Sequence, residues 1–214
     1  MGQQNNLSIQ LFLIVCIIAW LIGAYLLISD GSHYWFQVIN GLNNPHRDAY
    51  VPWITKMGEA WVIGPLLLLL LLIKAYRNKY FFILLAITQL VPLGITHLLK
   101  QIYRAPRPMH FFEQASWFHY VVGQPKQYMY SFPSGHTSGS FAMLTFIALL
   151  LPKKYAWLSI LLAVLGVAVG VSRIYLSQHF LEDILAGSII GTVFSLISYY
   201  IATYYIQKRH LQVP

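Results

Sequence analysis

Three short stretches of the sequence carry side chains suited to phosphate chemistry. Together they supply three cations, a hydroxyl, a glycine, two histidines and one carboxylate. These are Lys100 and Arg107 in KQIYRAPRP, Ser134, Gly135 and His136 in PSGH, and Arg173, His179 and Asp183 in SRIYLSQHFLED. Cations and hydroxyls stabilise the negative charge of a phosphoryl group, and histidines can attack it or move protons. The inventory therefore indicates a site that holds a phosphate and reacts with it.

The last stretch makes the most specific pattern. His179 and Asp183 are four residues apart, so they share a face if a helix begins there. A carboxylate beside an imidazole fixes its tautomer and leaves the other ring nitrogen free to react. Arg173 precedes the pair and stays charged. We expect these three residues to act together.

The PSGH stretch precedes a long apolar run and is expected to start a helix. The free N–H groups and the dipole at a helix start attract anions, Gly135 permits close backbone approach, and the Ser134 hydroxyl can donate once more. A capped helix start with an incidental His136 fits the same residues. Likewise, Lys100 and Arg107 fit headgroup contacts at a membrane boundary.

Two histidines and an aspartate also suggest a metal site. Three cations around them would repel a divalent ion. Asp183 is the one carboxylate at the motif positions, because the neighbouring Glu182 would point about 100° away on a helix. We therefore expect no metal. Ser134 as a nucleophile is a weaker hypothesis, because the ring of cations suits phosphate better than acyl transfer.

The composition favours a membrane protein. Of 214 residues, 57% are hydrophobic and 9% are charged, whereas about 25% of a soluble domain is charged. The net charge of +8 is spread over loops between apolar runs, which is typical of membrane topology signals, so we expect no nucleic-acid partner. Cys16 is the single cysteine, which excludes an intrachain disulfide.

The apolar runs predict an all-α, polytopic membrane protein: one domain over residues 1–214, with its motif-bearing core at about 80–200. Six runs are long enough to cross a bilayer, which takes about 20 residues. They are Leu7–Ile28, Val51–Ile73, Tyr80–Leu99, Ser134–Leu151, Tyr155–Ser177 and Leu181–Ile206.

Basic residues in the short connections predict the orientation. They are Lys74, Arg77, Lys79, Lys153, Lys154, Lys208 and Arg209. The positive-inside rule places them in the cytoplasm, with both termini. All three motifs then touch the outer face of a cytoplasmic (inner) membrane, toward the periplasm or exterior.

Taken together, the three stretches resemble the signature motifs of the type 2 phosphatidic acid phosphatase superfamily: Lys-x6-Arg-Pro, Pro-Ser-Gly-His and Ser-Arg-x5-His-x3-Asp. Every motif position is matched, in order, over about residues 80–200. The resemblance is to the bacterial lipid phosphatase branch, which includes phosphatidylglycerophosphatase B, undecaprenyl pyrophosphate phosphatases and lipid A phosphatases. The fold core is also similar to that of vanadate-dependent haloperoxidases.

The resemblance implies a role for each motif residue. His179 would form a phosphohistidine, Asp183 would orient it, and His136 would protonate the leaving oxygen and then activate water. The phosphoryl oxygens would be bound by Lys100, Arg107, Ser134, Gly135 and Arg173. No cofactor is implied, because the cations take the place of Mg²⁺.

The function predicted from these residues is a metal-independent lipid phosphate phosphatase. Its partners would be the bilayer and a lipid of the undecaprenyl pyrophosphate, phosphatidylglycerol phosphate or phosphatidic acid type, with no obligatory protein partner. A lipid A phosphatase and a lipid phosphotransferase using the same phosphohistidine are alternatives. A non-catalytic lipid transporter is a third hypothesis, but binding alone does not require His179 with Asp183.

Overall fold

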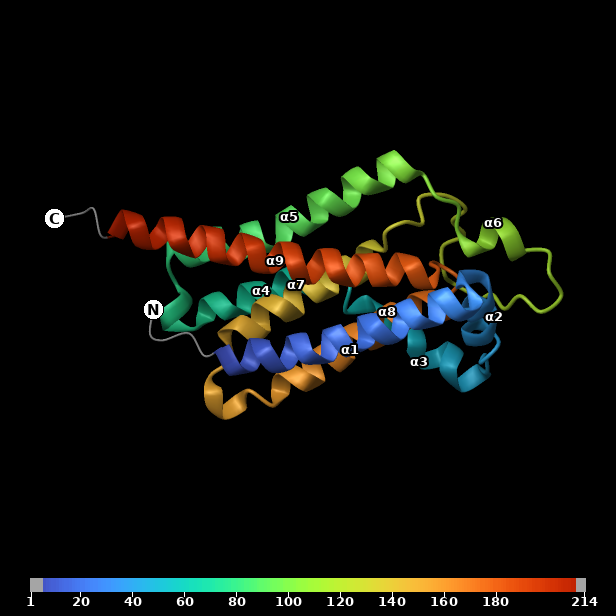
Figure 1. The fold of residues 1–214 in the computed structure, drawn as a ribbon, viewed down its shortest axis with the longest axis horizontal. Helices are drawn as coiled ribbons and strands as arrows, with labels where there is room; N and C mark the ends of the chain where they lie inside the picture. Colours follow the sequence, from blue (N-terminus) through green and yellow to red (C-terminus); the bar gives the residue numbers. More distant parts are fainter. Residues whose placement is uncertain (1–5, 211–214) are drawn as a thin grey trace.

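The computed structural model describes residues 6–210, and all regular elements in that range are helices (Figure 1). The prediction of an all-α chain is confirmed for this part. Residues 6–210 form nine α-helices and three short 3₁₀ helices, joined by loops. They are α1 (Asn6–Asp30), α2 (Ser32–Asn40), α3 (Pro45–Lys56), α4 (Ala60–Leu68), η1 (Leu69–Leu72), η2 (Lys74–Tyr76), α5 (Lys79–Tyr103), α6 (Pro108–Phe112), α7 (Gly135–Leu150), η3 (Lys153–Tyr155), α8 (Leu158–Tyr175) and α9 (Leu181–His210).

Five of the six predicted spans coincide with single helices: α1, α5, α7, α8 and α9. By length and composition, four segments of the described chain can cross a membrane, or five if a bent pair counts as one. The remaining helix, α7, is apolar but has only 16 residues. The predicted count of six spans is therefore not established by these criteria.

The predicted span Val51–Ile73 is not one continuous helix. In its place α3 and α4 meet at an angle of 52°, and residues 57–59 lie between them. The apolar pattern continues through the break, but glycine at Gly58 weakens a helix. A Cβ at Gly58 would lie within 3.0 Å of the His136 backbone, so the chain breaks where it meets the start of α7.

The short helix α7 is the centre of the bundle. It packs against α1, α4, α5, α8 and α9, and ten of its residues are buried. At 1.5 Å per residue it is roughly 24 Å long, shorter than the ~30 Å hydrocarbon core. Four of the five helices it contacts, α1, α5, α8 and α9, are longer than α7.

Close packing of α7 on α9 depends on two glycines of α9. A Cβ at Gly187 would lie within 3.0 Å of the Ser134 carbonyl oxygen, and one at Gly191 would clash with the Ser138 carbonyl oxygen. Small residues let helix backbones approach closely inside a membrane. Gly187 and Gly191, which are four residues apart, therefore pack α9 against α7 within the bundle.

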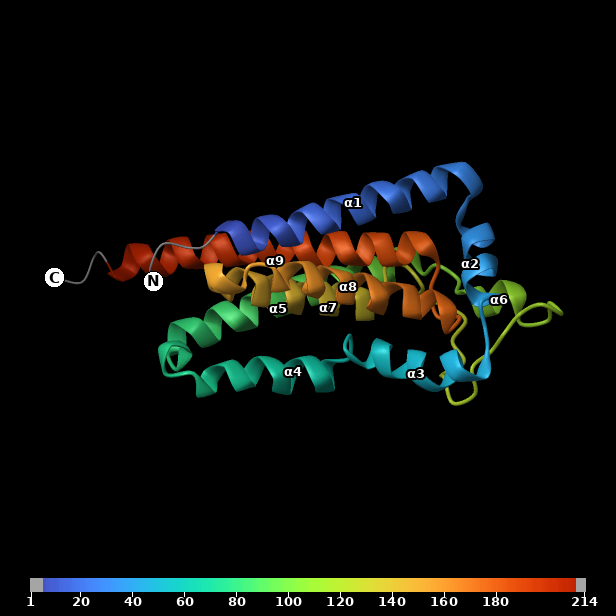
Figure 2. The same cartoon turned by 90° about the horizontal axis from the view of Figure 1, so that it is seen from below.

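The two ends of the bundle differ. The start of α1, the end of α9, η2 and η3 lie together at one end, and α2, α6 and the long loop before α7 lie at the other (Figures 1 and 2). At this second end Phe36 of α2 is fully buried and stacks on Phe112, with ring centroids 5.3 Å apart. An aromatic cluster thus covers the end at which the three motifs lie.

We predict that Gly191→Ala lowers the stability of the bundle by about 1–3 kcal/mol, as overpacking does, because the added Cβ meets the α7 backbone. The midpoint of thermal unfolding in detergent measures the effect. Gly94→Ala is the matched control, since nothing lies within 4 Å of its Cβ position. Equal midpoints for the two variants would contradict this account of the α7–α9 contact.

Candidate active site

The structure places the eight predicted site residues at one end of the bundle, on four helices and the connections beside them. Lys100 is in the last turn of α5, and Arg107 precedes α6. Ser134 caps α7, which begins with Gly135 and His136. Arg173 is in the last turn of α8, His179 is in the turn between α8 and α9, and Asp183 is in the first turn of α9. Direct contacts, described below, connect most of them. The segments come together because α5 and α8 end, and α7 and α9 begin, at this end of the bundle.

His179 and Asp183 form a buried pair. Their side chains are about 2% exposed, and His179 Nδ1 lies 3.3 Å from Asp183 Oδ2. The same carboxylate oxygen accepts hydrogen bonds from the backbone N–H of Phe180 (2.8 Å) and from the hydroxyl of Ser131 (2.5 Å). The carboxylate is thus fixed, and it occupies the Nδ1 side of the ring.

The opposite nitrogen of His179 faces a cation. Its Nε2 lies 3.5 Å from Nη1 of Arg107. Burial, followed by the positive charges of Arg107, Arg173 and Lys100, holds the pKa of His179 well below its ordinary value of 6.5. A neutral imidazole has a lone pair, so Nε2 is the nitrogen available for attack.

Backbone carbonyls hold Arg107 in place. Its Nε donates to the Met129 carbonyl (2.9 Å), and its Nη1 and Nη2 donate to the carbonyls of Gln178 (2.9 Å) and Tyr130 (3.3 Å). Arg107 is only 7% exposed. A guanidinium fixed in this way is preorganised, and it joins the loop before α7 to the α8–α9 turn.

Lys100 reaches the same loop from α5. Its ammonium donates to the carbonyls of Tyr130 (2.5 Å) and Ser131 (3.2 Å). Its Cε is 4.0 Å from the position a Cβ would take on Gly135. The third span and the PSGH stretch are therefore adjacent.

Arg173 is the most enclosed of the three cations. It is 5% exposed, its Nη1 donates to Thr55 Oγ1 (3.0 Å), and its Nε has no hydrogen-bond partner in the described part of the chain. Its carbonyl accepts the N–H groups of Gln178 (3.0 Å) and His179 (3.3 Å). Arg173 therefore supplies a buried charge and also shapes the turn that carries His179.

Ser134 is the N-cap of α7. Its Oγ accepts from the Thr137 N–H (3.4 Å) and hydroxyl (2.9 Å), which leaves its own O–H as a donor. Its backbone N–H donates to the Asp183 carbonyl (3.0 Å). The cap thus connects the start of α7 directly to the first turn of α9.

His136 has a more open environment than His179. Its side chain is 31% exposed, and its Nε2 lies 3.8 Å from a carboxylate oxygen of Glu59. Glu59 is the last residue of the break between α3 and α4. The two histidines thus each lie beside a carboxylate, one pair buried and one half-exposed.

Polar contacts outside the motifs position the α8–α9 turn. The buried side chain of Asn40 donates to the carbonyls of His119 (2.9 Å) and Tyr175 (3.2 Å) and to the Ser177 hydroxyl (3.0 Å), and it accepts the His119 N–H (2.9 Å). His119 and Tyr175 both bond to Asp48. These contacts connect α2, α3 and the loop before α7 to the turn between α8 and α9.

Sequence reasoning missed several site residues. Ser131 contributes a hydroxyl and Gln178 a carbonyl, and loops place both near the motif residues. Loops follow no periodic pattern, so the sequence does not predict these two contacts. Thr55 and Glu59 come from the broken second span. Glu59 did carry a signal, because an acidic residue within an apolar span is a functional candidate.

The geometry offers no obvious metal site. Among residues 6–210, no three histidine, cysteine, aspartate or glutamate side chains are placed to ligate one ion. The absence of a metal requirement remains a prediction that needs its own test.

Apolar helices with a histidine–aspartate pair among buried cations are the features expected of a membrane enzyme that handles phosphate groups. Residues 78–207 match the PAP2 superfamily, and the chain belongs to this superfamily. The match covers all three motifs.

Two relatives align with most of the chain. An undecaprenyl-diphosphatase of Sulfolobus acidocaldarius is 29% identical over 188 residues, covering 88% of this chain and 86% of the relative. A lipid A 4'-phosphatase of Bacteroides thetaiotaomicron is 28% identical, covering 82% and 78%.

Solved structures also match. Aquifex aeolicus LpxE superposes with a TM-score of 0.64 at 25% identity, covering 78% of this chain and 93% of that protein. A phosphatidylglycerolphosphate phosphatase of Bacillus subtilis gives a TM-score of 0.58 at 21% identity, with 91% and 96% covered. The second likeness concerns the fold alone.

Proposed function

We propose that the protein is a metal-independent lipid phosphate phosphatase that works through a phosphohistidine. The observation that carries this proposal is the buried His179–Asp183 pair, whose free Nε2 faces Arg107 at 3.5 Å. A neutral imidazole oriented by a carboxylate and pointed toward a fixed cation is suited to attack a phosphorus atom. Two relatives that align with most of the chain are named as phosphatases of lipids.

In the first step, His179 Nε2 attacks phosphorus and the bond from phosphorus to the lipid oxygen breaks. His136 gives its proton to that oxygen. In the second step, water attacks the phosphohistidine, the N–P bond breaks, and His136 takes the proton of the water. Phosphate leaves, and both histidines return to their starting states.

The site's charge favours this chemistry. Arg107 and Arg173 are 7% and 5% exposed, and Lys100 is half-buried, whereas Asp183 is the buried carboxylate of the cluster. Buried charges are stable only when paired. A dianionic phosphoryl group would balance the excess of positive charge. The Ser134 hydroxyl and the Gly135 N–H would add donors at the start of α7.

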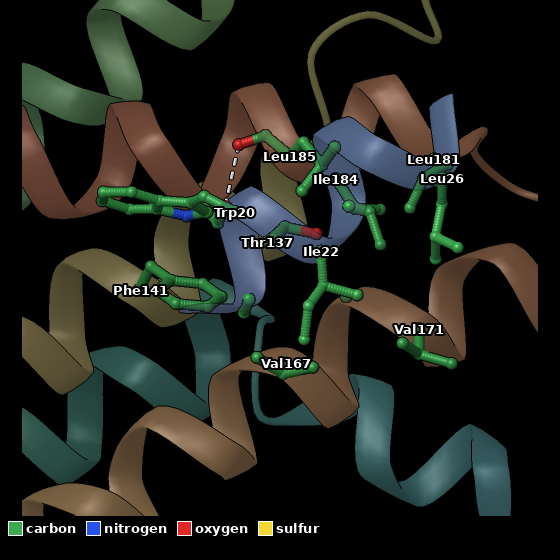
Figure 3. Close-up of a pocket in the computed structure, with 14 residues that line it drawn as sticks. Trp20, Ile22, Leu26, Thr137, Phe141, Val167, Val171, Leu181, Ile184 and Leu185 are labelled. Atoms are coloured by element: carbon green, nitrogen blue, oxygen red, sulfur yellow. Dashed lines mark hydrogen bonds between the residues drawn. The ribbon is translucent and has the colours of Figure 1, made fainter. Parts of the chain in front are cut away.

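The lipid tail would lie among the helices. Apolar cavities flank α7 on two sides: one of about 230 Å³ between α1, α8 and α9 (Figure 3), and one of about 390 Å³ between α4, α5 and α7. The second is lined by Gly135 and Gly58 and so adjoins the phosphate-binding residues. Substrates of the undecaprenyl pyrophosphate, phosphatidylglycerol phosphate or phosphatidic acid type fit this arrangement, and lipid A phosphates are the alternative.

The proposed location is a cytoplasmic membrane, with the site facing outward. Basic residues of η2 and η3 lie at the end of the bundle opposite the site (Figure 1). The positive-inside rule puts that end in the cytoplasm, together with the start of α1 and the end of α9. The terminal residues 1–5 and 211–214 lie outside the described part.

Hydrolysis and phosphotransfer share the first step. They differ in whether water or a second lipid accepts the phosphoryl group from His179. Release of inorganic phosphate from one pure lipid substrate supports hydrolysis, whereas transfer of labelled phosphate to an acceptor lipid, without release, supports a phosphotransferase.

We predict that His179→Ala abolishes measurable phosphate release, because it removes the nucleophile. The assay uses purified protein in detergent with phosphatidic acid, phosphatidylglycerol phosphate and undecaprenyl pyrophosphate in turn. His46→Ala is the control, since His46 is an exposed histidine in α3. Full activity of His179→Ala would refute the proposed mechanism.

The orientation of His179 gives a graded prediction. Asp183→Asn should lower kcat by about 10²- to 10⁴-fold, the range typical of acid–base groups. Ser131→Ala removes one hydrogen bond to the Asp183 carboxylate, a loss of about 1.5–3 kcal/mol, or roughly 10- to 100-fold. Ser140→Ala is the matched control, because its buried hydroxyl donates to a backbone carbonyl. A larger effect at Ser140 than at Ser131 would contradict the assigned role.

Metal independence has a direct test. We expect EDTA to leave the rate of phosphate release unchanged, because cationic side chains stabilise the phosphoryl oxygens. Vanadate, which resembles phosphate in its transition state, should inhibit. A rate that falls with EDTA and recovers on adding a divalent cation would show that a metal takes part.

A further inference from the structure

The break between α3 and α4 contacts the site in three ways. Thr55 accepts a hydrogen bond from Arg173 (3.0 Å), Gly58 packs against the backbone of His136, and Glu59 faces the His136 ring. None of these three residues belongs to the sequence motifs. The segment from Thr55 to Glu59 is therefore an additional part of the site.

The Glu59 carboxylate is oriented from both sides. One oxygen, Oε1, lies 3.8 Å from His136 Nε2, and the other accepts a hydrogen bond from the Trp61 indole N–H. The backbone of Glu59 is also fixed, because its carbonyl accepts the N–H of Ile63 (2.9 Å) at the start of α4.

A structural role does not account for this carboxylate. Glu59 is the N-cap residue of α4, but its side chain makes no capping hydrogen bond within the described region. Its side chain is 28% exposed, so it is not a packing residue. An ionisable group between apolar helices is costly in a membrane. Its charged neighbours are His136, whose Nε2 lies 3.8 Å from the carboxylate, and Arg173, on which the charge of Glu59 also acts.

We propose that Glu59 is the positioning residue of His136 and forms with it a second histidine–carboxylate pair. The inference rests on the proposed function. Glu59 accepts the Nε2 proton of His136, so Nδ1 is the nitrogen that exchanges protons with the leaving oxygen and with water. A distance of 3.8 Å is in the ion-pair range, and catalytic contacts of this kind often tighten when substrate binds.

The carboxylate opposes the cations that surround His136. The positive charges of Arg173 of α8, Arg107 before α6 and Lys100 of α5 all act on this ring. Glu59 favours the protonated form, because an opposite charge nearby stabilises imidazolium. The first step requires that proton: the lipid oxygen takes it from His136 as the P–O bond breaks.

Two substrates separate this role from a structural one. An alkyl phosphate such as phosphatidic acid has a poor leaving group that needs a proton, whereas 4-nitrophenyl phosphate has a leaving group that departs as an anion. Glu59→Gln keeps the shape and removes the charge. The variant should therefore lose much more activity on the first substrate than on the second.

The experiment compares kcat, KM and the pH profile of purified wild type and Glu59→Gln. We expect kcat for phosphatidic acid to fall by roughly 10- to 100-fold, up to the lower end of the usual acid–base contribution. KM should change little, the pH optimum should move to lower pH, and 4-nitrophenyl phosphate should be affected several-fold less. Glu59→Asp should restore part of the rate. Glu182→Gln is the matched control, since that carboxylate bonds to Ser32.

An equal loss on both substrates with an unchanged pH optimum would show that Glu59 only supports the fold, and an unchanged kcat would show that it plays no part. Either result overturns this inference alone. If wild type releases no phosphate, or His179→Ala remains active, the proposed function fails instead.

Discussion

The excess of buried positive charge beside His179 is the constraint on which the rest of this end of the molecule depends. Arg107 and Arg173 are almost fully enclosed, and ions removed from water need nearby polar partners. Most of those partners are backbone carbonyls from two loops. Tyr130 and Ser177 even adopt left-handed backbone conformations (φ 62° and 59°), which cost about 1–3 kcal/mol each. The Tyr130 carbonyl accepts from Lys100 and Arg107, and Ser177 precedes Gln178, whose carbonyl accepts from Arg107. The strained residues thus lie where the loops hold the cations.

The meeting of helix ends at the start of α7 explains how such a site fits a membrane protein. Ser134 and His136 lie at the end of the bundle where α5 and α8 end and α9 begins. Glycines of α9 allow the two helix backbones to meet there, and the Ser134 N–H bonds to the Asp183 carbonyl. The proposed phosphate-binding residues and the proposed nucleophile are thereby fixed to each other through main chain, which is stiffer than side-chain contact.

Hydropathy predicted most of the helices well, and motif spacing brought the eight site residues into one hypothesis. Hydropathy and motif spacing are read from neighbouring residues in the sequence. A long apolar run that crosses a bilayer forms a helix in nearly every case. The break at residues 57–59 was missed because its cause is tertiary: Gly58 meets the backbone of a helix almost eighty positions away in sequence. Ser131 and Gln178 were missed for a related reason. Their contribution depends on where loops place a hydroxyl and a carbonyl, and no periodicity records that.

The two histidines lie in different surroundings, which suit the two roles proposed for them: attack on phosphorus and proton transfer. His179 is about 2% exposed, with a carboxylate on Nδ1 and a cation facing Nε2. Those surroundings keep it neutral, as the proposed nucleophile must be. His136 is partly open and lies beside Glu59, and the same cations act on it. The proposed general acid and base must both give and take a proton, and the cations and Glu59 act on it in opposite directions from different segments. The break at residues 57–59 brings Glu59 to His136, where the proposed proton-transfer step would use it.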